Sequence, residues 1–155
     1  MKKLAIVSLI SIIIDQIIKV IITTNVEFAH SINVINNFFR ITYLQNTGAA
    51  WSILSGNRIF LIMITLIALG IIYYFFIKNK KLKNYESILY GILLGGILGN
   101  LIDRIRFGYV IDYLDFNIFS YHYPVFNFAD ICIVISIIII AIISLKEDKN
   151  GNNSR

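Results

Sequence analysis

Four long runs of apolar residues divide the chain. They cover residues 4–23, 59–77, 85–102 and 127–145. A helix of about 20 apolar residues crosses the hydrocarbon core of a bilayer, which is roughly 30 Å thick, so each run is close to the length of a membrane span. The second run has a threonine as its main polar interruption, whereas the other three carry further polar residues. The pattern predicts a membrane α-helical protein with four transmembrane helices.

The segments between the first two and the last two runs have a different pattern. Residues 28–45 and 109–123 are rich in β-branched and aromatic side chains that partly alternate with polar ones, which is typical of strands. A two-stranded ribbon alone is marginally stable, so we expect the two stretches to pair in a small sheet. Residues 49–55 contain Trp51 and predict an apolar turn or short helix at the headgroup level. No repeat, linker or second domain is visible, and we expect one domain over residues 1–155.

Composition excludes a soluble globule. Apolar residues make up 57% of the chain and charged residues 15%, whereas a soluble domain has about 25% charged residues. The net charge of +5 would suggest nucleic acid as the partner of a soluble protein, but in a membrane protein Lys and Arg report orientation. We therefore expect membrane lipids and no nucleic acid as partners.

Basic residues cluster at the start of the chain, between the second and third runs, and at the end, at positions 2–3, 78–83 and 146–155. With four spans, these three regions lie on one side of the bilayer, which the positive-inside rule identifies as the cytoplasmic side. Residues 25–58 and about 103–124 are then outside. The first run resembles a signal peptide, but it lacks an A-x-A site and carries Asp15 and Lys19, so we expect a retained helix.

Several kinds of chemistry find no support in the sequence. It has no His-x-Glu-x-x-His motif, its two histidines, His30 and His122, lie in the predicted outer strands, and no serine lies in a G-x-S-x-G motif. Cys132 is the sole cysteine, which excludes a disulfide or a CxxC pair, and its isoleucine neighbours indicate an inert buried thiol. We expect neither a metal nor an organic cofactor.

Polar residues in membrane helices are expensive and are candidates for function. The predicted topology gathers nearly all of them in one layer near the outer face. This layer consists of Asp15, Lys19, Asn46, Asn100, Asp103, Arg104, Asp112, Asn127 and Asp130. Asp15 and Lys19, four residues apart, also fit a purely structural ion pair. Gly91, Gly95 and Gly99 form one face of the third helix and are better explained by close helix packing.

Paired carboxyl groups are the chemistry that this layer supports. Two carboxyl groups held close together share one proton, and the resulting acid and base can activate water against a carbonyl. Spacing does not decide which two groups form the pair. Asp103 is followed directly by Arg104, so a salt bridge would explain it. Asp115 lies near the aromatic outer segment, where exposure to solvent would explain it. Asp112 and Asp130 are the less clearly neutralised pair.

The chain resembles the bacterial lipoprotein signal peptidases, or signal peptidase II, over most of its length. The resemblance rests on short motifs in a fixed order. These are Asp15, Gln16 and Lys19, then 46–52 (NTGAAWS), 99–104 (GNLIDR), 108–113 (GYVIDY) and 126–130 (FNFAD). One departure is Ser136, where many members are expected to have glycine, and it bears on helix packing rather than chemistry.

The resemblance implies four transmembrane helices with a small extracytoplasmic β-cradle. It implies an aspartic endopeptidase of the bacterial cytoplasmic membrane that removes signal peptides from diacylglyceryl-modified prolipoproteins by cleaving before the lipidated cysteine. It assigns catalysis to Asp112 and Asp130. The other matching polar positions are implied to bind substrate or support the site, and they are Asp15, Lys19, Asn46, Gly48, Asn100, Asp103, Arg104 and Asn127.

Two other classes of function also fit charged residues inside membrane helices. A small proton-coupled transporter would use them as an ion path, but such a path needs polar groups through the whole bilayer, and the inner halves of these spans are nearly all apolar. A noncatalytic membrane scaffold would tolerate removal of the carboxyl groups. The peptidase is the function that we expect.

Overall fold

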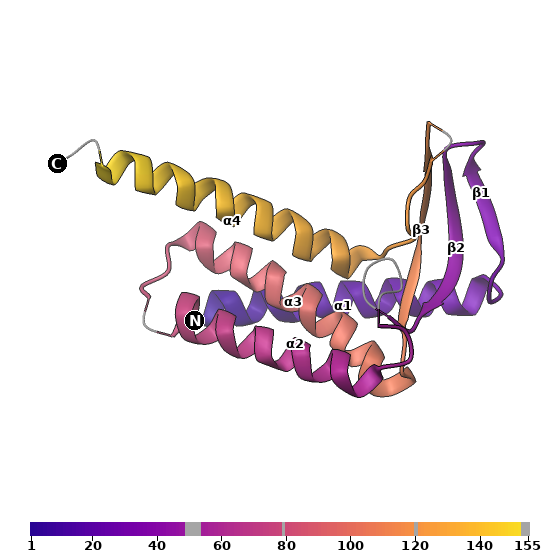
Figure 1. Ribbon diagram of the computed structural model, residues 1–155, viewed down its shortest axis with the longest axis horizontal. Coiled ribbons are helices and arrows are strands. Elements are labelled where there is room, and N and C mark those ends of the chain that lie inside the picture. The colour runs from indigo at the N-terminus through magenta and orange to yellow at the C-terminus, as the bar shows by residue number, and fades with distance from the viewer. Residues whose placement is uncertain (49–53, 79, 120, 153–155) are drawn as a thin grey trace.

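The computed structural model describes residues 1–48, 54–78, 80–119 and 121–152 of the chain (Figure 1). Its helices are α1 (Lys2–Asn25), α2 (Arg58–Ile72) with the π-helical continuation η2 (Tyr73–Ile77), α3 (Asn84–Phe107) and α4 (Phe128–Asn152). Its strands are β1 (Ser31–Ile35), β2 (Phe39–Asn46), β3 (Val110–Ile118) and β4 (Tyr121–His122). The helices run along the long axis, and the sheet stands across one end of them, opposite both chain termini.

The four predicted spans are confirmed as helices long and apolar enough to cross a membrane, at Lys2–Asn25, Arg58–Ile77, Asn84–Phe107 and Phe128–Lys146. The third helix continues beyond its predicted end at residue 102. It does so because Asp103 is fully buried among helices, although its charge interrupts the hydropathy pattern. The helix ends at Gly108, whose φ of 88° suits glycine at a helix C-terminus.

The predicted outer strands are also confirmed. The sheet has four strands in the order β1-β2-β3-β4, and each neighbouring pair is antiparallel. The pairing of β2 with β3 joins the two outer segments, which are far apart in the sequence, and matches Asn46 with Val110 and Leu44 with Asp112. His30 precedes β1 rather than lying in a strand. The expected turn around Trp51 falls largely on residues 49–53, which lie outside the described part of the chain.

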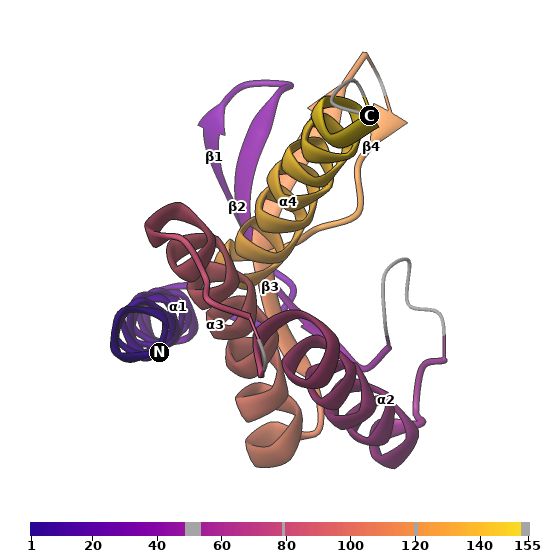
Figure 2. The same ribbon diagram turned by 90° about the vertical axis from the view of Figure 1, so that its left-hand side faces the viewer.

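Helix α3 is the centre of the bundle and packs against α1, α2 and α4 (Figure 2). One face of α1 is buried, and four of its six buried residues are polar; they are Leu4, Ser8, Ser11, Asp15, Lys19 and Ile22. The isoleucines on the rest of α1 are exposed, as expected for side chains that face lipid. The bundle therefore buries polar groups of α1 beside an apolar cluster of Leu4, Ile77, Tyr90 and Leu93, and its outer surface is apolar.

The predicted packing role of the glycine series is confirmed. A Cβ atom on Gly95 would lie 2.5 Å from the Cβ of Ser11, and one on Gly99 would lie 2.5 Å from a carboxylate oxygen of Asp15. Gly96, on the neighbouring face, brings α3 equally close to the backbone of Ala129 in α4. Glycine at these positions lets α3 touch α1 and α4 at backbone distance.

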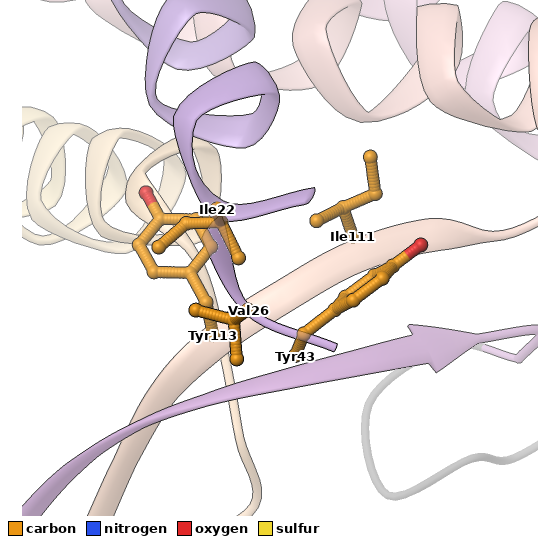
Figure 3. Packing of buried hydrophobic residues seen from close by; sticks show 5 residues of the cluster. All are labelled: Ile22, Val26, Tyr43, Ile111 and Tyr113. Carbon is orange, nitrogen blue, oxygen red and sulfur yellow. The ribbon is translucent and has the colours of Figure 1, made fainter. Parts of the chain in front are cut away.

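A small hydrophobic core fixes the sheet to the end of α1 (Figure 3). Ile22 and Val26 from α1 and its C-terminal end pack against Tyr43 of β2 and against Ile111 and Tyr113 of β3. All five side chains are at least 92% buried. Since β3 also carries Asp112, this core determines how that carboxyl group is presented to the helices.

The close approach at Gly95 predicts a difference between two glycine substitutions. Gly95→Ala is expected to lower the free energy of unfolding by about 1–3 kcal/mol, because the added methyl group overpacks the contact with Ser11. Gly70→Ala is the matched control, since a Cβ atom there meets nothing within 4 Å. Thermal unfolding of both variants in detergent measures the effect, and equal melting temperatures would contradict the packing role.

Candidate active site

Asp112 and Asp130 lie on different elements that meet beneath the sheet. Asp112 is the third residue of β3, and Asp130 lies in the first turn of α4. Asn127 contacts both carboxyl groups. Its side-chain amide donates to Oδ1 of Asp112 at 2.7 Å, and its backbone N–H donates to Oδ2 of Asp130 at 3.2 Å. One fully buried asparagine therefore fixes the two carboxyl groups relative to each other.

Asn127 and Asp130 also form a reciprocal cap at the start of α4. The backbone N–H of Asp130 donates to Oδ1 of Asn127 at 3.0 Å, which complements the bond from the Asn127 backbone to the Asp130 carboxyl group. This is the geometry of a capping box, in which two otherwise unpaired amides at a helix start are satisfied. The Asp130 carboxyl group is thus positioned by the helix start itself.

Asp112 receives a second hydrogen bond from the end of β2. The amide of Asn46 donates to Oδ2 of Asp112 at 2.9 Å, while Oδ1 of Asn46 accepts from the backbone N–H of Gly48 at 2.9 Å. The turn after β2 therefore fixes the orientation of the Asn46 amide. Both oxygens of Asp112 are held by amide donors.

A buried charge network lies between α1 and α3. The ammonium group of Lys19 lies 2.8 Å from Asp15 and 2.7 Å from Asp103. Gln16 adds a hydrogen bond of 2.9 Å to Asp103. The predicted pair of Asp15 and Lys19 is present, but Lys19 is shared with a second carboxylate. All three charged side chains are 2% exposed or less, so each depends on the others for compensation.

Asn100 connects this network to the candidate pair. Its Oδ1 accepts a hydrogen bond of 3.0 Å from Lys19, and its amide donates to Oδ1 of Asp130 at 2.8 Å. Oδ1 of Asn100 also accepts a hydrogen bond of 3.2 Å from the side-chain amide of Asn127. The chain of bonds runs from Lys19 through Asn100 to Asp130.

Arg104 lies at the edge of the site. Its guanidinium group donates to the backbone oxygen of Gly48 at 3.0 Å and thereby fastens the turn after β2 to α3. Its buried Nε has no hydrogen-bond partner among the described residues. Arg104 thus brings a buried cation and an unused donor to the groove that contains Asp112 and Asp130.

The surroundings of Asp112 favour its protonated form. Burial is the larger cause and the Asp130 carboxyl group the second, and together they raise the pKa of Asp112 to about 7. The hydrogen bonds from Asn46 and Asn127 act in the opposite direction. A carboxyl group with this pKa can hold a proton near neutral pH, as an acid and base pair requires.

Both carboxyl groups face a groove of about 990 Å³. One part of it is lined by aromatic residues of the sheet and by the segment before α4, including Phe116 and Phe126. The other part follows apolar residues of α4, namely Ile131, Val134 and Ile135. The groove therefore leads from a polar centre to the lipid-facing side of a membrane helix.

One expectation about a neighbouring carboxyl group is wrong. Asp115 is 4% exposed rather than solvated, and it forms an ion pair of 2.6 Å with Arg40 and accepts a hydrogen bond of 2.8 Å from Thr42. The partners lie in β2, and strand register, which the sequence did not reveal, brings Arg40 opposite Asp115. Asp115 therefore joins the two strands and is occupied by structural contacts.

The remaining reactive side chains among the described residues form no metal cluster. Within the described ranges, no group of three or more His, Cys, Asp or Glu side chains could hold a metal ion. Cys132 is buried in α4, and Ser136, at the unusual position noted above, is buried with its hydroxyl unpartnered among the described residues. Gln16 was not predicted as a site residue, but it donates to Asp103, and its place in the motif with Asp15 and Lys19 was the signal for it.

Four apolar helices and a carboxyl-rich groove beneath a small sheet define a multi-pass membrane protein with an enzyme-like site. Residues 7–146 match the family model described as "Signal peptidase (SPase) II". The chain belongs to this family, and it is accordingly a peptidase. The family resemblance noted in the sequence is thereby confirmed.

The chain is also similar to curated lipoprotein signal peptidases and to solved structures of bacterial membrane enzymes. The chain is 44% identical over 139 residues to "Lipoprotein signal peptidase" of Staphylococcus aureus strains JH9 and Newman, covering 90% of this chain and 85% of each relative. A solved bacterial membrane enzyme structure, obtained by the in meso method at 2.3 Å, is 40% identical with a TM-score of 0.87, covering 97% of this chain and 92% of that one. A second, at 1.9 Å, has a TM-score of 0.83 at 40% identity, with 94% of each chain covered.

The buried network predicts a strong effect of removing its cation. Lys19→Met is expected to lower the free energy of unfolding by about 3–5 kcal/mol, because Asp15 and Asp103 lose the charge that compensates them. The double variant Asp15→Asn/Lys19→Met should recover part of the loss. Thermal unfolding measures both, with Arg40→Met as control, since that side chain is 38% exposed in its ion pair and should matter less. A larger loss at Arg40 would contradict the prediction.

Proposed function

We propose that this chain is an aspartic endopeptidase that removes signal peptides from diacylglyceryl-modified prolipoproteins and cleaves before the lipidated cysteine. Asp112 and Asp130 are the reacting carboxyl groups. The observation that carries the proposal is that Asn127 holds both groups at once, at the polar centre of a groove that opens toward lipid. Family membership supports the substrate class.

The reaction requires one carboxylate and one carboxylic acid. The carboxylate takes a proton from water while the water oxygen attacks the scissile carbonyl carbon. The acid donates its proton to the carbonyl oxygen. The resulting gem-diol then collapses: one of its hydroxyl groups returns a proton to the former acid as the C=O bond re-forms, the C–N bond breaks, and the amine leaves with the proton held by the former base. The reaction consumes one water, and the pair ends with the single proton with which it started.

The shape of the groove supports entry of the substrate from the bilayer. Ile131, Val134 and Ile135 lead from the lipid-facing side of α4 to the carboxyl groups, so an apolar signal helix can approach without crossing a polar barrier. The diacylglyceryl chains can remain in lipid, where burial stabilises them by about 0.8 kcal/mol per CH₂ group. The modified cysteine is then held at the depth of the carboxyl pair.

The orientation follows from the positions of the lysines. The lysines at 78, 80, 81 and 83 lie in the connection from η2 to α3. Lys2 and Lys3 begin α1, whose N-terminal end lies opposite the sheet, and Lys3 donates to Asn84 at the start of α3. The positive-inside rule assigns that end and both termini to the cytoplasm, and the carboxyl pair to the outer face of the bacterial cytoplasmic membrane. Residues 1–155 act as one peptidase domain.

Substitution of either carboxyl group tests the proposal. Asp112→Asn and Asp130→Asn are each expected to lower the cleavage rate of a lipidated precursor by at least about 10²–10⁴-fold, because the amide keeps the shape but cannot exchange the proton. The measurement is peptide release by purified protein in detergent. Asp115→Asn is the control and should retain far more activity, since Asp115 is engaged by Arg40. Near-normal rates for Asp112→Asn would exclude the pair.

Recognition of the lipid gives a second prediction. One precursor, prepared with and without its diacylglyceryl group, should be cleaved much faster when it carries the lipid, because lipid anchoring fixes the cysteine at the level of the pair. Conservative changes in the signal helix should have smaller effects. Rates are compared in one detergent at equal protein concentration. Equal rates for the two precursors would mean that the peptide sequence alone sets the register.

A proton-coupled transporter is the alternative, and the distribution of charge disfavours it. No charged residue occurs at 4–14, 59–77, 87–102 or 131–145. Apart from the turn at the opposite end of each span, the charges inside the spans therefore lie in the halves nearer the sheet, with Asp15 the deepest in the first span. An ion path needs polar groups across the full thickness. Proton flux into liposomes that depends on Asp112 and Asp130, without peptide cleavage, would favour the transporter.

A further inference from the structure

The two carboxyl groups of the candidate pair have unequal surroundings. Asp130 lies at the start of a helix of 25 residues, where unpaired backbone amides concentrate positive potential. One of these amides, that of Asn127, donates directly to the Asp130 carboxyl group. Asp112 lies in a strand, which has little net dipole, and its carboxyl oxygens accept hydrogen bonds from the neutral side chains of Asn46 and Asn127. The helix start favours a negative charge on Asp130.

The bond from Asn100 strengthens this difference. Lys19 donates to the Asn100 oxygen at 3.0 Å, and the Asn100 amide donates to Asp130 at 2.8 Å. A cation on the oxygen side of an amide polarises its N–H groups, and hydrogen bonds in a chain reinforce each other. Asp112 receives no bond from Asn100 or Lys19 among those found in the described residues. The charge of Lys19 therefore reaches Asp130 through a directed contact.

The other titratable and charged groups around the pair do not remove the asymmetry. α1 contributes Asp15 and Lys19, α3 contributes Asp103 and Arg104, β3 contributes Tyr113, and α4 contributes Cys132. Asp15 and Asp103 share the single ammonium group of Lys19, Asp15 also accepts the N–H of Ala129 at the start of α4, and Arg104 attracts both members of the pair. The Tyr113 hydroxyl accepts the N–H of Phe128 in the same helix turn as Asp130.

We propose that the pair is fixed in one protonation state, with Asp130 as the ionised carboxylate that activates water and Asp112 as the carrier of the shared proton. Lys19 acts through Asn100 as a positioning residue for this state. The assignment rests on the proposed function and makes it more specific. The pKa of Asp112, which burial raises to about 7, is consistent with an acid that retains its proton up to neutral pH.

Two asparagine substitutions distinguish this assignment from its reverse. The rate of cleavage against pH should be bell-shaped, with an acidic limb set by the base and an alkaline limb set by the acid. Asn100→Ala removes a donor to Asp130, and Asn46→Ala removes a donor to Asp112. Loss of a donor makes the ionised carboxyl group less stable, so the corresponding limb moves to higher pH by about one unit.

The expected result is that Asn100→Ala moves the acidic limb and Asn46→Ala moves the alkaline limb. The opposite pattern, with Asn100→Ala moving the alkaline limb, would reverse the roles. Limbs that stay in place while the rate falls at every pH would reduce both asparagines to structural supports. Asn100→Ser and Asn46→Ser serve as second variants if an alanine variant does not fold. Inactivity of folded alanine and serine variants at either position would also overturn the assignment.

The contribution of Lys19 is tested in the Asp15→Asn/Lys19→Met variant, which removes one positive and one negative charge together. Its acidic limb should move in the same direction as that of Asn100→Ala. An unmoved limb in a folded variant would remove Lys19 from the proposal. Failure of the proposed function is recognised separately, because wild-type protein would then not cleave the lipidated precursor, or Asp112→Asn would still cleave it.

Discussion

Charge cannot be left unpaired in a bilayer, and the rest of this structure depends on how Lys19 meets that constraint. Its ammonium group is shared by Asp15 on its own helix and by Asp103 on α3. This sharing ties α1 to α3 at the depth where Gly99 permits close contact with Asp15. The third hydrogen bond of Lys19 orients Asn100 and so reaches the candidate pair. Helix packing and site geometry therefore have a common origin.

The candidate pair is assembled from rigid elements. Asp130 is positioned by the cap of α4, and Asp112 is positioned by a strand whose other face packs on Ile22 of α1 and on Val26, directly after that helix. Asn127 joins the two elements through bonds to both carboxyl groups. Sites built on helices and strands hold their geometry more closely than sites built on loops. The arrangement suits a reaction in which one proton moves between fixed groups.

The sequence could predict the features that depend on local pattern, such as the four spans, the strands and the packing face of Gly91, Gly95 and Gly99. The spacing of Asn127 and Asp130 before an apolar run also signals a capping box. Contacts that depend on strand register or on helix rotation could not be read in this way. The pairing of Asp115 with Arg40 arises from register, and the sharing of Lys19 between two carboxylates arises from helix rotation.

In the proposed mechanism the two carboxyl groups activate water directly, with no covalent bond between protein and substrate. Mass spectrometry of one turnover in ¹⁸O-labelled water tests it, with purified protein in excess over a lipidated precursor. The account predicts that the signal peptide acquires one ¹⁸O atom at its new carboxyl terminus and that the mass of the protein stays unchanged at every time point. A transient protein species heavier by the mass of the signal peptide acyl group would contradict it.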